Sequence, residues 1–133
     1  MVENNSQWDN KMKIMPTSSE VPEDPMGPKG FGKCAVLVKR PTTVITKDCF
    51  EFPTRAVPEE LEEGTVLVKH ILVSCDPTHR IWMSNMTQYM PSVGLNTIMR
   101  AGTTARVVKT SNESKMAVGT VITCVGGVCE YSV

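Results

Sequence analysis

The chain has 133 residues, of which 41% are hydrophobic, so it can form one globular domain but not two domains of ordinary size. Its 14 Lys and Arg residues balance 14 Asp and Glu residues, and this zero net charge argues against nucleic acid or an anionic membrane surface as a partner. No apolar run approaches the roughly 18 residues of a membrane helix, and positions 1–8 lack the order of a secretory signal. The five cysteines are odd in number and show no paired spacing, which fits a reducing compartment, so we expect a cytoplasmic protein.

Residues 1–32 differ in composition from the rest of the chain. Four of the nine prolines lie here, at Pro16, Pro22, Pro25 and Pro28. Proline interrupts helices and sheets, and a polar segment buries too little apolar surface to offset the entropy lost on ordering. We expect a flexible, disordered leader; the alternative is a partner-binding peptide centred on Trp8 with Met12 or Met15.

From Lys33 onward, short apolar or β-branched runs alternate with Gly, Pro, Asn and Asp, which is typical of an all-β domain. The runs predict seven strands: Cys34–Lys39, Thr43–Thr46, Cys49–Arg55, Thr65–Ser74, Ile98–Lys109, Thr120–Cys124 and Val128–Val133. Lys47-Asp48 is short enough to be a hairpin loop between the second and third. The longest run, Thr65–Ser74, is apolar on both faces, which predicts a central strand.

One short helix is expected between the fourth and fifth predicted strands. Asp76 and Pro77 suit an N-cap and a first helical position, so Asp76–Ser84 should form a helical turn. A loop at residues 85–97 follows it. The predicted fold class is therefore all-β with one short helix, arranged as a small, closed or partly open β-barrel.

Few residues in the chain suggest a metal site or a nucleotide site. No glycine-rich phosphate loop joins a predicted strand to a helix. Cys75 and His79 are four residues apart and could share a helix face, but no second pair with zinc-ligand spacing follows. We interpret them as a structural cysteine and a surface histidine, and we expect no metal.

A pair of cysteines and one histidine are further candidates for reactive groups. Cys124 and Cys129 flank Gly126-Gly127, and a hairpin turn at these glycines would make the two cysteines face each other, although we favour two free thiols. His70 lies within the predicted central strand, where we interpret it as a structural residue rather than a general base. No Ser/His/acid or Cys/His/acid set can be assembled by spacing.

Five segments occur in an order and at spacings that match a known family: Leu61–Lys69, Ile71–Arg80, Ile98–Val108, Val118–Ile122 and Gly127–Val133. Together they resemble the N-terminal GroES-like domain of medium-chain dehydrogenases/reductases. The most similar branch is zinc-independent and NADP-dependent, and it contains quinone oxidoreductases, 2-alkenal reductases and leukotriene/prostaglandin reductases. The resemblance covers Lys33–Val133 and implies a GroES-like, partly open β-barrel.

The resemblance has departures that bear on chemistry. Zinc-dependent members of the superfamily carry a Gly-His-Glu ligand motif in the strand matched here by Met99–Val108, which contains neither His nor Glu. The four-cysteine lobe for structural zinc is missing as well, so the resemblance implies a protein without zinc. The branch usually has Tyr after Asp-Pro, where this chain has Thr78, and a large residue where it has Val128. No substrate preference is therefore implied.

The resemblance also implies a longer protein, in which a doubly wound domain that binds NADPH follows this one. The chain ends at Val133, where the connection to that domain would begin, so we interpret it as an excised first domain that is inactive alone. In the full-length protein, a hydride would pass from the nicotinamide to a quinone or to the β-carbon of an α,β-unsaturated carbonyl.

Site residues follow from their positions in the matched motifs. The substrate side of the cleft is expected to contain Asp76, Thr78 and Arg80. The segment near the nicotinamide is expected to contain Met99, Arg100, Gly102 and Thr103. For Asp76 and Arg80 the alternative is a helix cap and an ion pair, and no residue is assigned a catalytic role.

Two expectations concern partners. Without the second domain an apolar cleft wall would be bare, so we expect some self-association, aided by exposed methionines at Met83, Met86, Met90 and Met99. The rival hypothesis is a non-enzymatic small β-barrel that acts as a binding or oligomerisation module. A β-α-β segment with a glycine fingerprint after Val133 would favour the reductase.

Overall fold

The computed structural model describes residues 14–15, 29–111 and 115–133. The predicted leader, residues 1–32, falls mostly outside these ranges. Its described parts are β1 (Ile14–Met15) and the start of β2 (Gly30–Cys34), so β2 begins four residues before the predicted strand.

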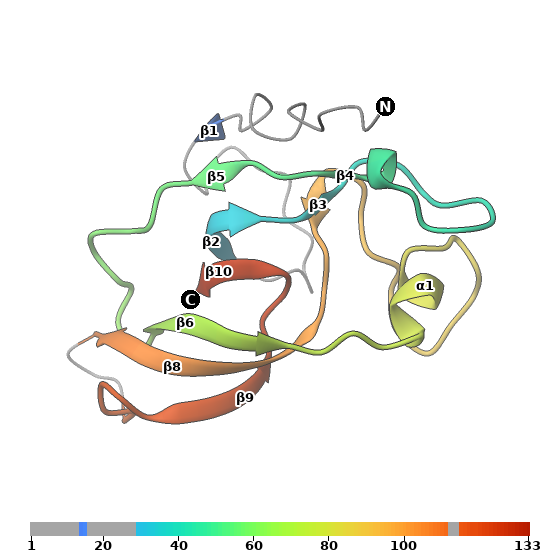
Figure 1. Cartoon of the computed structure of the whole chain (residues 1–133). Coiled ribbons are helices and arrows are strands. Elements are labelled where there is room, and N and C mark those ends of the chain that lie inside the picture. Colours follow the sequence, from blue (N-terminus) through green and yellow to red (C-terminus); the bar gives the residue numbers. More distant parts are fainter. Residues whose placement is uncertain (1–13, 16–28, 112–114) are drawn as a thin grey trace, which may run out of the picture.

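The described residues are mostly strands, with one short α-helix, as predicted (Figure 1). The remaining strands are β3 (Val36–Leu37), β4 (Phe50–Glu51), β5 (Thr54–Arg55), β6 (Val66–Val73), β7 (Thr97–Ile98), β8 (Gly102–Thr110), β9 (Val121–Val125) and β10 (Cys129–Ser132). The helix α1 (Thr78–Trp82) follows β6 at the end of the molecule toward which β6 points (Figure 1).

The strands form two open sheets rather than a closed barrel. One sheet has the order β1-β5-β2-β10-β6-β8-β9, and the other has the order β4-β3-β7. All pairs are antiparallel except β1 with β5. The strand β6 lies between β10 and β8, which confirms the predicted central position. Its last three side chains, Ile71, Leu72 and Val73, are nevertheless exposed.

The prediction of a strand at Thr43–Thr46 with a hairpin at Lys47-Asp48 is wrong. Lys47–Cys49 forms a single 3-10 turn instead. The Asp48 carboxylate accepts a hydrogen bond from the Thr46 hydroxyl and pairs with the Lys39 ammonium. Both bonds lower the pKa of Asp48, and the bond from Lys39 has the larger effect. Side-chain bonds to one carboxylate therefore close this loop, which a turn propensity alone does not reveal.

The alternative of a hairpin turn at Gly126-Gly127, with Cys124 and Cys129 facing each other, is excluded, because β9 and β10 do not pair with each other. β9 pairs with β8, whereas β10 pairs with β2 and β6. Cys124 therefore lies opposite Thr103, and Cys129 lies opposite Cys34. A Cβ at Gly126 would lie 2.2 Å from Cε1 of His70, so only glycine fits where this crossing connection passes the sheet.

The buried apolar side chains form separate clusters. The largest packs α1 against β3 and contains Leu37, Cys49, Trp82, Met83, Val93 and Met99. A second cluster lies between β2, β3, β7 and β10, and a third lies between β6 and β8. The first cluster connects the helix to the small sheet, so it fixes the position of α1.

Truncation of Leu37 tests this cluster. Leu37 is fully buried, so Leu37→Ala is expected to lower the free energy of unfolding by about 2–5 kcal/mol. Leu95 is 44% exposed, and Leu95→Ala is the matched control, with an expected loss of about 0.5 kcal/mol or less. Urea unfolding measures both, and equal losses would contradict this packing.

The His70 side chain makes stability depend on pH. Its Nε2 lies 3.0 Å from the Ser132 hydroxyl, and burial lowers the pKa of His70 below its ordinary value of about 6.5. The unfolded chain then binds more protons than the folded chain below about pH 6.5, so stability falls as the pH drops through this region. The urea midpoint should decrease between neutral pH and pH ~5, and should decrease less in His70→Asn. Equal decreases in both proteins would contradict the assignment.

Candidate functional site

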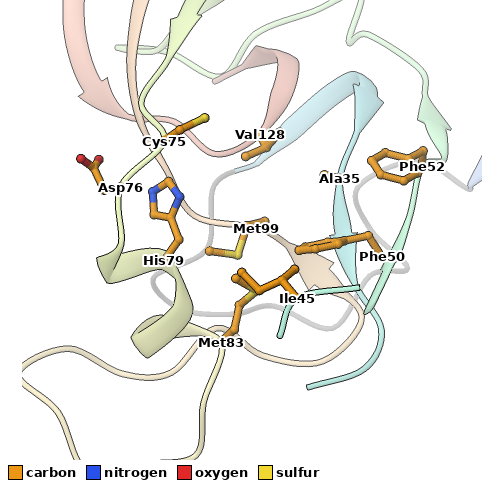
Figure 2. A pocket seen from close by; sticks show the side chains of 10 residues that line it. All are labelled: Ala35, Ile45, Phe50, Phe52, Cys75, Asp76, His79, Met83, Met99 and Val128. Carbon is orange, nitrogen blue, oxygen red and sulfur yellow. The ribbon is translucent and has the colours of Figure 1, made fainter. Parts of the chain in front are cut away.

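A cavity of about 440 Å³ opens between α1, the small sheet and the segment that follows β7 (Figure 2). Its lining is mostly apolar and consists of Ala35, Ile45, Phe50, Phe52, Cys75, Asp76, His79, Met83, Met99 and Val128. Figure 2 shows Asp76 and His79 together on one side, opposite Phe50 and Phe52. The cavity therefore has one polar side and an extended apolar remainder.

Three backbone hydrogen bonds join the segments behind the cavity. The Ala35 amide donates to the Val128 carbonyl, the Val128 amide to the Met99 carbonyl and the Met99 amide to the Ala35 carbonyl, each at 2.8 Å. We call this closed set the Ala35–Met99–Val128 ring. It connects three segments that are distant in the sequence, and the side chain of each residue lines the cavity.

The polar side of the cavity is built where β6 ends. The Ser74 amide donates to the Gly102 carbonyl at 2.8 Å, and the Ser74 hydroxyl donates to the Asp76 carboxylate. The His79 amide then bonds the Asp76 carbonyl at 3.0 Å. The prediction of a side-chain N-cap by Asp76 is therefore wrong: Pro77 is the N-cap, without a side-chain cap bond, and the Asp76 carboxylate is held by Ser74.

His79 is more enclosed than the sequence indicates. Its ring lies 5.2 Å from the Trp82 ring, and its Nε2 is enclosed with no hydrogen-bond partner among the described residues. Cys75 is exposed and lies beside it in the cavity lining. Both side chains line the same cavity, which their interpretation as a structural cysteine and a surface histidine did not anticipate.

Thr78 belongs to a short chain of hydrogen bonds beside the cavity. The Trp82 indole Nε1 donates to the Tyr89 hydroxyl at 2.9 Å, and this hydroxyl lies 3.0 Å from the Thr78 hydroxyl. An indole N–H can only donate, so the Tyr89 oxygen accepts that bond. The hydroxyls of Tyr89 and Thr78 carry one hydrogen each. One of these hydrogens forms the bond between the two hydroxyls, and the other remains available to a ligand.

The buried or half-buried arginines hold the loops around the cavity. Arg80 donates to the carbonyls of Pro41, Thr42 and Thr43, which lie in the loop that carries Ile45. Its guanidinium is therefore bound to backbone carbonyls rather than to Asp76, and Arg80 is not among the residues that line the cavity.

Arg40 and Arg100 act on the loop at residues 85–97. Arg40 donates to the carbonyls of Met83 and Val93 at 2.8 and 3.0 Å. Arg100 is 1% exposed, lies 5.7 Å from the Trp82 ring and donates to the Pro91 carbonyl at 3.0 Å. The structure thus places Arg100 beneath this loop.

The other residues expected near a nicotinamide are divided between the cavity and the sheet. Met99 lines the cavity, whereas Thr103 is buried and its hydroxyl donates to the Cys124 carbonyl at 3.4 Å. A Cβ at Gly102 would have only an ordinary 3.7 Å contact with Ser74, so no close backbone approach requires glycine there. The close approach is at Gly126 instead.

The expectation of four exposed methionines is wrong for two of them. Met83 and Met99 are 2% and 3% exposed, because both belong to the largest buried cluster. Met86 is 70% exposed, and Met90 is partly buried against the same cluster.

Most of the lining was not identified from the sequence. The alternation of Phe50 and Phe52 in a predicted strand does place both on one face, and this signal could have marked an apolar surface. Ile45 and Val128 carry no such signal, because they reach the cavity only through loop anchoring and through the crossing connection after β9.

No three His, Cys, Asp or Glu side chains gather into a metal-binding group within residues 14–15, 29–111 and 115–133. In the same ranges, no helix has the length and apolar character needed to cross a bilayer.

Comparison with known proteins identifies the class to which this domain belongs. Residues 33–133 match the family described as the N-terminal domain of oxidoreductase. The chain belongs to this family, and its fold is the GroES-like domain of medium-chain reductases.

Individual relatives agree with this assignment. The putative NADP-dependent oxidoreductase YfmJ of Bacillus subtilis (strain 168) is 35% identical over 79 residues, which are 59% of this chain and 23% of that protein. The crystal structure of CurA from Vibrio vulnificus gives a TM-score of 0.70 at 29% identity, over 74% of this chain and 29% of that one. The crystal structure of CurA in complex with NADPH gives a TM-score of 0.70 at 28% identity, over 75% of this chain and 29% of that one. The chain thus spans less than a third of each relative's length.

The hydrogen bonds of Tyr89 make a prediction about the loop. Tyr89→Phe removes the acceptor of the Trp82 indole and the partner of Thr78, at a cost of about 1 kcal/mol. Amide hydrogen exchange across residues 85–92 should become several-fold faster. Tyr131→Phe removes a hydroxyl elsewhere and is the control that leaves this loop unchanged; a Tyr89→Phe protein with unaltered exchange would contradict the role of this hydroxyl.

Proposed function

We propose that the cavity is the substrate-side wall of the active-site cleft of an NADP(H)-dependent oxidoreductase, and that the substrate is a quinone or an α,β-unsaturated carbonyl compound. The observation that carries this proposal is the division of the cavity into an apolar part and one polar side with Asp76 and His79. A planar, mostly apolar molecule with a carbonyl oxygen is complementary to such a site.

In this proposal, the cofactor binds to another domain of the full-length protein. The described residues contain no strand, glycine loop and helix in succession that could hold a pyrophosphate. The description of YfmJ as NADP-dependent and the NADPH complex of CurA support NADPH as the cofactor of the full-length protein. When bound, NADPH supplies the hydride.

The residues of this chain prepare the substrate side of the reaction. The side chains of Phe50, Met99 and Val128 give the cavity an apolar lining, and a substrate bound there would displace water, which strengthens the hydrogen bonds formed inside it. As negative charge develops on the substrate oxygen, the imidazole of His79, which lines the cavity, can donate a hydrogen bond to it.

We propose that this step needs no zinc, because a hydrogen bond from His79 meets the developing charge. The remaining residues have supporting roles in this proposal. Asp76 shapes the polar side of the cavity, and Arg80 positions the loop that carries Ile45. Met99 lies on the side toward the nicotinamide. Its segment is supported from behind by Arg100, Gly102 and Thr103.

Filling the cavity tests the proposed substrate site. A saturating titration of the chain with an apolar enone or quinone should shift the amide resonances of Met99 and Val128. Ile45 lines the cavity, so Ile45→Trp should weaken binding at least about tenfold. Val44 is the neighbouring control, since it is 69% exposed and outside the cavity, and Val44→Trp should bind normally. Equal affinity of the two variants would refute this location.

The proposed binding of the cofactor to a separate domain makes a second prediction. The chain alone is expected to leave NADPH unoxidised in the presence of a quinone or an enone, because it lacks a pyrophosphate site in its described part. Joined to an NADPH-binding domain, it should support turnover. Micromolar NADPH binding by the chain alone, measured by calorimetry, would overturn the proposal.

A further inference from the structure

Two of the five cysteines lie opposite each other in the large sheet. The register of β2 with β10 pairs Cys34 with Cys129. The Cys34 amide donates to the Pro53 carbonyl at 3.0 Å and therefore points away from β10. The next amide, that of Ala35, points toward β10 and donates to the Val128 carbonyl. This pattern marks a non-hydrogen-bonded antiparallel pair, in which the two Cα atoms are about 4.5 Å apart. A disulfide spans this separation, since its Cα atoms lie roughly 4.4–6.8 Å apart.

The two thiols share one buried cluster, with Val36 and Ile98. Cys34 is 2% exposed and Cys129 is 8% exposed. The Cys129 Sγ lies 3.3 Å from the Gly126 carbonyl oxygen. The interaction between the two thiols lowers the pKa of Cys34 and raises that of Cys129, and burial raises the pKa of both.

A buried cation lies beside this pair. Arg55 on β5 is 7% exposed, and its Nε and Nη2 are enclosed without a hydrogen-bond partner among the described residues. Its charge favours the thiolate of Cys34, whereas the charge of Glu130 opposes it. A guanidinium cannot lose its proton, so it needs a nearby negative charge when it is buried. Deprotonation of Cys34 would provide one, so Arg55 favours loss of this proton.

The other three cysteines lack these surroundings. Cys49 is in the cluster around α1, Cys75 is exposed, and Cys124 lies opposite Thr103. Cys75 and Cys124 therefore serve as internal controls for thiol reactivity in the same chain.

We propose that Cys34 and Cys129 form a reactive dithiol that a peroxide oxidises to an intramolecular disulfide between β2 and β10. The Cys34 thiolate attacks one peroxide oxygen and breaks the O–O bond, which gives a sulfenic acid at Cys34 and, with hydrogen peroxide, one water after proton uptake. The sulfur of Cys129 then attacks the sulfenic sulfur, loses its proton and expels the second water. In total, two thiols lose two electrons to one peroxide.

This disulfide would lie directly behind the cavity. Ala35 follows Cys34 and Val128 precedes Cys129 in the sequence, and both residues line the cavity. The inference itself does not depend on the proposed reductase activity, because it concerns only the two thiols and Arg55.

The experiment treats the folded, reduced chain with hydrogen peroxide, alkylates the remaining thiols and maps the peptides by mass spectrometry. The expected product is a peptide pair linked through Cys34 and Cys129, formed faster than oxidation of the exposed Cys75. Cys124→Ser should leave this product unchanged. Cys129→Ser should stop the reaction at a sulfenic acid on Cys34, which dimedone traps.

Arg55→Gln should slow formation of the disulfide several-fold, and Arg55→Lys, which keeps the charge, should slow it less. The proposal is overturned if Cys34 and Cys129 are both alkylated after Cys75 has been oxidised, or if the main disulfide joins another pair of cysteines. The wild-type peptide map decides this by itself, even if the Arg55 variants do not fold.

Discussion

The Ala35–Met99–Val128 ring of backbone hydrogen bonds is the constraint on which the rest of the structure depends. It joins the segment after β2, the segment after β7 and the segment before β10 at one place. Gly126 and Gly127 extend it by donating to the Ala101 carbonyl at 3.1 and 3.3 Å. Because the chain crosses here instead of turning back, β10 enters the sheet between β2 and β6, and Cys129 comes to lie opposite Cys34.

The cavity follows from this ring and from a few arginines. The ring places three apolar lining residues side by side, and the guanidinium groups of Arg40, Arg80 and Arg100 fix the surrounding loops by donating to backbone carbonyls. These cations are bound within the domain, which leaves the cavity mainly apolar, with His79 and Asp76 as its polar groups. In the proposed function, a cavity lined in this way would suit uncharged carbonyl compounds better than phosphorylated or strongly charged ones.

The fold class, the central position of β6 and the helix after Asp-Pro could be predicted from the sequence, because each depends on local periodicity or on a short motif. The partners of β10 could not be predicted, since Gly126-Gly127 has the composition of a hairpin turn and only the packing against His70 selects the crossing. For the site, the matched motifs singled out Asp76 and Met99, and both residues line the cavity. Ile45, Phe50 and His79 required the tertiary arrangement of loops that Arg80 and the small sheet position.

Native-state hydrogen exchange of the three ring amides tests the central claim most directly. If the ring organises the domain, the amides of Ala35, Met99 and Val128 will exchange slowly and together, at rates similar to those of buried β8 amides such as Val107, whose N–H bonds the Thr120 carbonyl at 2.8 Å. If the Val128 amide exchanges rapidly, as in an exposed hairpin turn, while Val107 remains protected, the ring is not the element that holds the domain and its cavity together.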